Sequence, residues 1–486
     1  MDSITQLQGK LNEANNLLQY VSRELDGYAE RGNNSKINFS ELKLRGEQYG
    51  FYEHPLKNCD FQDEYMTLLV SLLVSGDKEE EGWTILYQIA TGADYKNDLP
   101  SLVKDAQTLT EERFAEILRM ISSCNLSHTF AIDSLLLGHR MGADDAQLKL
   151  LAGIFELLKL DVAFLKEAMS FVQILDSTLW EDYAYKSKAW KLLTAQDMAT
   201  YIGGIATNSI KDAMEMKDTR IVISDIVHND KNMLLFDNWK AKEILFLRCK
   251  FMKIGGMFSS KKRLIFADCS FDENVAHFAD DHRYKYLAHY VWTDEQYAVY
   301  RNFIKLSNSC FVRCAFTNFR DAVPMMDLDK CLIRECMLEK CGQGPSSSIL
   351  LKFRNSNITT TTFKECSSYR SYGTNGSSRN GNDTSTGCVI YLSNSKSEEN
   401  IFDNCSNMVC DGSYGFSCLV ILDNHSYMKN CQFSNSGSSW SGDRYRHGRT
   451  YMLQMCNSEE SENKGVDSIG HIDSVPEKIF LIVDKL

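Results

Sequence analysis

The chain has 486 residues, an apolar fraction of 43% and a net charge of −12. A chain of this length exceeds what one hydrophobic core usually serves, so at least two domains are expected. No stretch approaches the ~20 uninterrupted apolar residues of a membrane span, and the N-terminus lacks the basic and apolar regions of a secretory signal. These features predict a soluble, cytoplasmic protein.

Charge and cysteine are distributed unevenly along the chain. Residues 226–486 hold 31 Lys and Arg against 30 Asp and Glu, so the negative balance belongs to residues 1–225. Phosphate contacts depend on Lys and Arg, which disfavours nucleic-acid binding by the N-terminal half. Fourteen of the 16 cysteines lie at or after Cys249. Without a secretion signal, thiols are the expected state, so this asymmetry indicates a change of architecture.

Residues 1–30 carry a heptad pattern, with polar residues between apolar ones at spacings of three and four. Four heptads suffice for pairing with another helix. The partner is either another protomer, in a coiled coil through residues 3–29, or a helix of the same chain. The sequence leaves both open. The apolar positions are Ile4, Leu7, Leu11, Ala14, Leu18, Val21, Leu25 and Tyr28.

Residues 31–217 predict an acidic, all-α domain of antiparallel helices joined by short loops. In "TLTEERFAEILRMISS", Thr110 is the expected N-cap, and Glu111 and Glu112 favour the positive end of the helix dipole.

Within this domain, "LLLGHRMGADDAQLKLLAGIFELLKLD" resembles the TerB-like helical domain, over residues 127–175. The family typically joins an apolar helix ending near "ADG" to a helix of the type "ELxLLxxIAxxLGLD". Here Asp145 replaces the glycine and Gln147 stands where glutamate is common. The resemblance implies a role in stress response or phage defence. It also implies Asp144 and Asp145 as metal candidates, although adjacent carboxylates at a helix start also serve as capping charge.

Residues 218–475 contain a repeat, Φ-x-x-C with Φ apolar. A second element precedes most copies, in which apolar residues alternate and end at Asn or Asp. These turn residues are Asn308, Asp329, Asn355, Asn394, Asn424 and Asn457. The seven repeat cysteines are Cys249, Cys269, Cys314, Cys336, Cys366, Cys405 and Cys431.

Short apolar runs at a base period of 20-odd residues predict a parallel β-solenoid, in which equivalent side chains stack as inward ladders. Cysteine suits a tight inner corner, and asparagine suits a turn with positive φ. The pattern resembles the right-handed parallel β-helix of pectin-lyase-like proteins; a pentapeptide-like solenoid and a β-sandwich are the alternatives. Residues 276–305 look like an insertion, and residues 476–486 like a C-terminal strand or cap.

The regularly spaced cysteines of "CLIRECMLEKCG" need their own interpretation. Structural zinc sites usually place cysteines as C-x₂₋₄-C pairs. Cys331, Cys336 and Cys341 have no matching second pair. The spacing therefore predicts that the three cysteines recur as the coil passes from turn to strand to corner. It predicts buried thiols, no metal and no cofactor.

Three long loops follow ladder positions in successive coils, at residues 367–387, 407–416 and 434–449. Equivalent points of stacked coils lie on the same side, so these loops should cluster. Their Tyr, Ser, Gly, Asn, Trp and Arg content is typical of adaptable binding surfaces, although such loops can also be disordered. The candidate binding residues are Tyr369, Arg370, Tyr372, Arg379, Tyr414, Trp440, Arg444, Tyr445, Arg446 and Arg449.

Together these patterns favour a non-enzymatic recognition or scaffold protein that binds a partner through the clustered loops. A carbohydrate-active β-helix enzyme is one alternative and predicts an acidic groove on one face. However, no paired carboxylates recur on adjacent coils, and Asp329 is already assigned to a turn. A trimeric structural or tail-type protein is the other alternative and predicts a three-stranded coil at the heptads.

Overall fold

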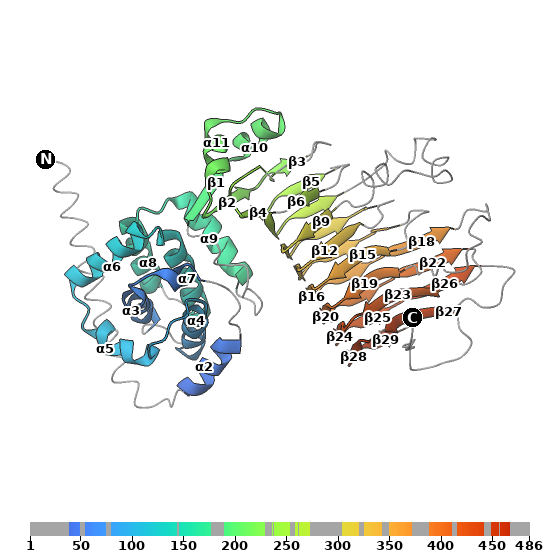
Figure 1. The fold of residues 1–486 in the computed structure, drawn as a ribbon, viewed down its shortest axis with the longest axis horizontal. Helices are drawn as coiled ribbons and strands as arrows, with labels where there is room; N and C mark the ends of the chain where they lie inside the picture. The colour runs from blue at the N-terminus through green and yellow to red at the C-terminus, as the bar shows by residue number, and fades with distance from the viewer. Residues whose placement is uncertain are drawn as a thin grey trace. The chain divides into compact units, whose positions relative to one another are not determined.

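A computed structural model gives the fold, which combines helices with long parallel sheets (Figure 1). It divides into two compact units. The first comprises Met1–Leu192 and Met216–Ile221, and the second Leu193–Glu215 and Val222–Leu486. The structure describes residues 38–48, 54–73, 79–142, 145–175, 189–228, 236, 238–252, 258–260, 262–272, 304–319, 325–342, 349–371, 388–410, 416–441, 449–455 and 457–466.

The first unit is built of helices. Thr110 accepts a hydrogen bond from the Arg113 amide at 3.3 Å, which confirms the predicted N-cap. Helix α7 contacts α3, α4 and α9 and so provides the centre of the packing. The elements are α2 (Phe39–Gln48), η1 (Pro55–Asn58), α3 (Gln62–Leu73), α4 (Glu79–Gly92), η2 (Leu99–Ser101), α5 (Leu102–Gln107), α6 (Glu111–Ser123), α7 (Ser127–Met141), α8 (Asp145–Leu157) and α9 (Val162–Leu175).

Two further helices and a strand follow. Strand β1 (Ala189–Leu193) falls in the range that the sequence assigned to helices, and it precedes α10 (Ala195–Ile202) and α11 (Asn208–Glu215). Helix α10 begins with a capping box between Thr194 and Asp197. The five residues "AWKLL" show no strict alternation of apolar and polar positions, which explains why the strand was not predicted.

Two large sheets of nine strands or more belong mostly to the second unit; only β1 and the start of β2 fall in the residue ranges of the first. Sheet A has ten strands, in the order β1, β2 (Thr219–Ser224), β4 (Glu243–Leu247), β7 (Arg263–Ala267), β10 (Cys310–Val312), β13 (Leu332–Arg334), β16 (Asn357–Thr359), β20 (Lys396–Glu398), β24 (Tyr427–Lys429) and β28 (Glu459–Ser461). Sheet B has nine, in the order β3 (Val227–His228), β5 (Lys250–Met252), β8 (Ser270–Asp272), β11 (Ala315–Thr317), β14 (Met337–Glu339), β17 (Thr362–Lys364), β21 (Ile401–Asp403), β25 (Gln432–Ser434) and β29 (Lys464–Val466).

Two smaller sheets complete this unit. Sheet C has seven strands, in the order β6 (Phe258–Ser260), β9 (Ile304–Ser307), β12 (Met326–Asp329), β15 (Ile349–Arg354), β19 (Cys388–Ser393), β23 (Phe416–Asp423) and β27 (Arg449–Met455). Sheet D has three, β18 (Ser367–Ser371), β22 (Ser406–Cys410) and β26 (Gly437–Ser441).

The chain moves through these sheets in a repeating order, from C to A to B, with D inserted after B in three coils. Every strand pair whose register is described is parallel; examples are β10 with β13, β11 with β14 and β12 with β15. Because consecutive strands go to different sheets, each neighbour within a sheet comes from the next coil. This arrangement confirms the predicted solenoid of parallel strands after N-terminal helices.

Phenylalanine rings form the interior of the early coils. Phe246, Phe266 and Phe311 occupy one register position of sheet A and stack with 4.9 Å between successive ring centroids. Sheet B supplies the facing stack, and Phe271 lies 4.7 Å from Phe316. These rings are at most 1% exposed. The Φ position of the repeat is therefore the inward position of a three- to five-residue strand.

Most adjacent strands are joined by a two-residue corner, in which the first residue has positive φ and the second is small and buried. The corner between β23 and β24 has three residues, with positive φ at both Asn424 and His425. Between sheets C and A the first residue is asparagine in five coils, at Asn308, Asn355, Asn394, Asn424 and Asn457, with φ between 46° and 52°. This confirms the role predicted for asparagine, because it tolerates the left-handed region. The amide of Asn394 also donates to Oδ1 of Asn355 in the neighbouring coil, at 2.7 Å.

One turn residue was assigned wrongly from the sequence. Asp329 is the last residue of strand β12, and Lys330 takes the positive φ of 54°. The Asp329 carboxylate instead accepts a hydrogen bond from the Asn355 amide at 2.7 Å. The alternation "MMDLD" ends in a residue type common in turns, so the sequence placed the turn one residue early.

Three predicted segments lie wholly or largely outside the described residues. These are the heptads of residues 1–30, the insertion of residues 276–305 up to residue 303, and the C-terminal segment of residues 476–486.

Candidate interaction face

Cys331, Cys336 and Cys341 lie at three successive corners of one coil. They follow strands β12, β13 and β14, and each is at most 2% exposed. A three-residue strand plus a two-residue corner repeats every five residues, and this explains the spacing. The prediction that the five-residue spacing follows the strands and corners of one coil is confirmed.

The repeat Φ-x-x-C predicts a single ladder of seven cysteines, and this is wrong, because they form two ladders at different corners. Five occupy the corner between sheets A and B: Cys249, Cys269, Cys314, Cys336 and Cys431. Cys366 and Cys405 occupy the corner after sheet B, together with Cys341. Both corners follow a strand with an inward Φ residue, so the motif Φ-x-x-C cannot distinguish them.

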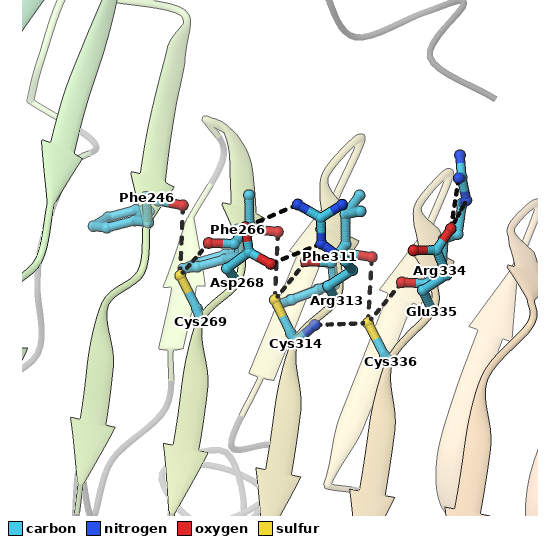
Figure 2. A network of polar contacts seen from close by, with 12 residues as sticks. Phe246, Phe266, Asp268, Cys269, Phe311, Arg313, Cys314, Arg334, Glu335 and Cys336 are labelled. Atoms are coloured by element: carbon cyan, nitrogen blue, oxygen red, sulfur yellow. Dashed lines mark hydrogen bonds and ion pairs between the residues drawn. The ribbon is translucent and has the colours of Figure 1, made fainter. Parts of the chain in front are cut away.

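Each ladder thiol contacts two backbone carbonyls. The Sγ atom of Cys336 lies 3.2 Å from the Arg334 oxygen in its own coil and 3.4 Å from the Phe311 oxygen in the preceding coil (Figure 2). Burial raises the pKa of Cys331 to about 12 and that of Cys341 above its ordinary range. In the part of the chain that the structure describes, no three His, Cys, Asp or Glu side chains are placed to hold a metal ion.

Charged residues line the outside of the corner between sheets A and B. The Arg313 guanidinium makes two hydrogen bonds to the Asp268 carboxylate, at 2.7 and 3.0 Å (Figure 2). Arg248 pairs with Asp225 in the same bidentate way, at 2.8 Å for both bonds. These charges neutralise one another, so this corner offers little net charge to a ligand.

The first residues of the three long loops are brought together in sheet D. Strand β22 pairs with β18 on one side and β26 on the other, all in parallel. The register places Arg370 beside Val409, and Val409 beside Trp440. Tyr369 occupies the neighbouring register position, beside Met408. The starting points of the loops therefore lie on one side of the solenoid, as the stacking of coils predicted.

Four of the ten predicted binding residues fall in described strands. Tyr369 and Arg370 lie in β18, Trp440 in β26, and Arg449 begins β27 of sheet C. Arg449 is thus separated from the sheet D residues and pairs in register with Phe416. The other six lie outside the described residues: Tyr372, Arg379, Tyr414, Arg444, Tyr445 and Arg446.

Sheet D lies against sheet C, since β22 contacts β23 and β26 contacts β27. Along the strands of sheet C, buried apolar residues alternate with partly exposed polar ones. One outward register position runs from Lys305 through Asp327 and Lys352 to Tyr391. A second outward register position, two residues further along each strand, includes Asp329, Arg354 and Asp423. We call these outward residues together with sheet D the C/D face.

Side chains on the sheet C part of this face contact one another across coils. The Arg354 guanidinium lies 2.8 Å from the Asp327 carboxylate. The Tyr391 hydroxyl donates to Asp423 at 2.5 Å, and the Lys352 ammonium lies 5.8 Å from the centroid of the Tyr391 ring. Burial and the Asp423 carboxylate raise the pKa of Tyr391 to about 12, so this hydroxyl stays protonated and donates. The arrangement is an ordered polar surface with an aromatic ring.

Sequence reasoning missed this part of the face. The signal was present in the alternation of "LLKFR", "VIYLS" and "LVILD", whose polar positions face outward. Recognising it requires the register between coils, because connecting segments of different length separate Arg354 from Tyr391 and Tyr391 from Asp423 along the chain. Carboxylates from different coils therefore looked unrelated in the sequence.

The TerB-like segment corresponds to helices α7, α8 and α9. Asp145 begins α8, and Asp144 lies outside the described residues. The choice between a capping charge and a metal ligand at Asp145 stays a prediction. The metal interpretation gains no support from the described residues.

The helical unit contains a buried polar cluster that the sequence did not reveal. His54, Tyr65 and Asp133 are at most 1% exposed. The Leu56 amide donates to Nδ1 of His54, so Nε2 carries the proton and faces Asp133 Oδ2 at 3.1 Å. The Tyr65 hydroxyl donates to the same oxygen at 2.6 Å. Because no member reaches solvent, the cluster joins η1, α3 and α7 rather than serving a ligand.

Comparison with known proteins shows no close relative. No family model and no curated protein matches the chain. Among the solved structures that match it, two at low identity are the following. The lacto-N-biosidase of family GH136 from Eubacterium ramulus is 8% identical over 93% of this chain and 98% of its own, with a TM-score of 0.24. QnrB1, a plasmid-mediated fluoroquinolone resistance protein, is 12% identical over 46% of this chain and 93% of its own, with a TM-score of 0.12.

No helix among the described residues is long and apolar enough to cross a membrane.

Proposed function

We propose that this chain is a recognition protein that binds a partner protein through the C/D face and the loops that leave sheet D. Its parallel sheets close into a right-handed β-helix, which acts as a rigid support for these loops. The observation that carries the proposal is the register of sheet D, because it places on adjacent strands the starts of three loops that together contain Tyr, Arg and Trp. Stress response and phage defence remain predictions from the TerB-like resemblance.

Rigid support matters for recognition because loops on a fixed frame lose less conformational entropy on binding. Strand β22 is hydrogen-bonded on both sides, so its backbone spacing to β18 and β26 is fixed by the sheet. Tyr, Trp and Arg dominate the energetics of many protein interfaces. Sequence places all three residue types in or next to sheet D, which favours a protein partner over a small ligand.

The polar contacts of sheet C favour recognition over carbohydrate chemistry. An acid/base pair on a sugar needs two carboxyl groups that face the substrate. Asp327 is paired with Arg354, Asp329 accepts from Asn355, and Asp423 accepts from Tyr391. These side chains are engaged with protein partners instead of being presented as a catalytic pair.

The direct test combines Arg444→Ala, Arg446→Ala and Arg449→Ala in the full chain. Bound proteins are captured by cross-linking in cells and quantified against wild type. The matched control changes two lysines on the outward side of sheet A, Lys396→Ala and Lys429→Ala. We expect the loop variant to lose at least about tenfold of specific partner signal, since buried interface arginines often contribute about 2 kcal/mol. Equal loss in both variants, or none in the loop variant, would refute the proposal.

Self-association through residues 3–29 needs a separate measurement. Light scattering on the full chain and on a chain lacking residues 1–30 distinguishes the two interpretations of the heptads. A mass that falls from a multiple to that of one chain indicates a coiled coil between protomers, and a trimer would revive the structural alternative. One chain in both samples leaves a helix of the same chain as the partner.

A further inference from the structure

The last coil of the solenoid has a side chain that is buried although no further strand covers it among the described residues. Strands β27, β28 and β29 are the final members of sheets C, A and B. Their outer edges have no strand partner among the described residues. Nevertheless Leu453, in β27, is 0% exposed. An inward side chain in a terminal coil would be open to solvent on one side unless something covers it.

The stack of phenylalanine rings in sheet B also indicates that another group covers the end of the solenoid. Phe363, Phe402 and Phe433 stack in sheet B at centroid distances of 4.8 and 4.6 Å. In the next strand their register position is taken by Gly465, which has no side chain. Phe433 is still only 1% exposed. The space that a further ring would fill is therefore kept from water by another group.

At β28 and the corner that follows it, the last coil has polar residues facing inward instead of apolar ones. The inward position that Met428 holds in β24 is taken by Glu460 in β28. Asn463 donates to Glu460 at 2.9 Å and to the Met428 carbonyl at 3.1 Å. Both polar residues remain partly exposed. The cover thus lies over the side of Leu453 and Gly465, where the open end is apolar.

We propose that residues 479–483 of the same chain, "IFLIV", dock on this open end as a terminal strand or cap. The chain continues for 20 residues beyond Val466, and 12 of them separate Val466 from Ile479. Such a linker can span up to ~40 Å when extended, so it can turn back onto the coil. A continuous run of five apolar residues is typical of a strand buried on both faces.

Charge favours the chain's own segment over a second copy. The last coil carries Glu459, Glu460 and Glu462 with one lysine, Lys464. The apolar run is flanked by charges of both signs, Glu477 and Lys478 before it and Asp484 and Lys485 after it, so it brings no net charge to this end. Two copies meeting end to end would bring the same glutamates together, and like charges on neighbouring strands are destabilising. The inference concerns the end of the solenoid and is independent of the proposed partner binding.

Hydrogen exchange on full-length protein tests this docking. The variant is Phe480→Asp, and the matched control is Ser474→Asp, which adds the same charge to the same segment outside the apolar run. We expect amides of residues 451–466 to exchange at least about tenfold faster in Phe480→Asp and at the wild-type rate in Ser474→Asp. Unchanged exchange in β10 and β13 shows that the earlier coils stay folded.

A cross-linking measurement supplies an independent readout. With p-benzoylphenylalanine in place of Phe480, irradiation should join position 480 to residues 449–466 within one chain. Links between chains, or wild-type protection that disappears on dilution, would identify a second copy as the cover and overturn the proposal. Wild-type exchange rates in Phe480→Asp would overturn it as well.

Discussion

The backbone amide of Cys331 donates a 3.0 Å hydrogen bond to the hydroxyl of Ser356, which occupies the same corner in the next coil. Ser356 in turn donates its amide to Ser395 Oγ at 3.0 Å, and Ser395 donates to Ser426 at 3.1 Å. A buried amide needs an acceptor. Because the preceding residue has positive φ, the amide of the corner residue makes no hydrogen bond to the neighbouring strand and needs a side-chain acceptor instead. The corner residue must therefore be small and able to accept, which cysteine and serine both satisfy.

Ser356→Ala is expected to destabilise the solenoid by about 1–3 kcal/mol, because it leaves the buried Cys331 amide without its acceptor. Urea denaturation followed by circular dichroism measures the change. Ser356→Cys is the matched comparison and should recover part of the loss, since Cys331 fills the equivalent position and its sulfur accepts from the Ser309 amide at 3.4 Å. Equal stability of the alanine variant and wild type would contradict this account of the corner.

Phe311→Ala is expected to cost about 3–5 kcal/mol, because it removes the last ring of the Phe246, Phe266 and Phe311 stack and leaves a cavity in the buried interior. The ring lies 4.9 Å from Phe266 and 5.4 Å from Phe316 between centroids. Phe311→Leu should cost much less, because Ile333 and Ile358 hold the same register position in the following coils. Urea midpoints of the two variants decide the matter. Similar losses for alanine and leucine would contradict this account and show that the aromatic ring itself, and not apolar volume, sets the stability here.

The repeat could be predicted from the sequence because local chemistry and fold agree at the corners between sheets C and A. A residue tolerating positive φ, a small buried residue and an inward apolar residue recur close together in the chain, as in "RNSNI" from Arg354 to Ile358. Asn355 and Asn394 were therefore located correctly. Arg248 and Arg313 also have positive φ, of 52° and 49°, but arginine carries no turn signal. For that reason the corner between sheets A and B was seen only through its cysteines.

The candidate face was predictable only in part. The clustering of the loops followed from stacking alone, and sheet D confirms it for the residues that begin each loop. The contacts of Tyr391 with Asp423 and of Arg354 with Asp327 depend on register between coils of unequal length. Similarly, His54 and Asp133 are 79 positions apart and meet only through the packing of η1 against α7. Such contacts leave no local pattern in the sequence.

The corner thiols are expected to resist alkylation in the folded protein. The thiolate is the reactive form, and burial raises the pKa of Cys331 to about 12. At about pH 8, iodoacetamide should therefore leave Cys331, Cys336 and Cys341 unmodified in native protein and modify them in denaturant. Cys124 is exposed and serves as the internal control. Peptide mass mapping reads the outcome, and native labelling of Cys336 at the rate of Cys124 would rule out a closed corner.

The helical unit is expected to lose stability as the pH falls from about 6.5 to about 4, because burial lowers the pKa of His128 to about 4. Its Nδ1 accepts a hydrogen bond from the Trp190 amide at 3.3 Å, and its ring packs 4.3 Å from that of Phe164. The folded state therefore keeps the imidazole neutral, whereas the unfolded chain binds a proton near the ordinary value of 6.5. Protonation consequently favours the unfolded state throughout this window.

His128→Asn tests this assignment, because its side-chain oxygen can replace Nδ1 as acceptor without titrating. Urea denaturation at a series of pH values should give a lower stability than wild type near neutrality, since packing against Phe164 is lost. The decline between pH 6.5 and pH 4 should be shallower than in wild type, because the titrating group is gone. His139→Asn, at an exposed position of the same helix, is the control and should keep the wild-type slope. A His128→Asn profile as steep as that of wild type would place the acid sensitivity elsewhere in the helical unit.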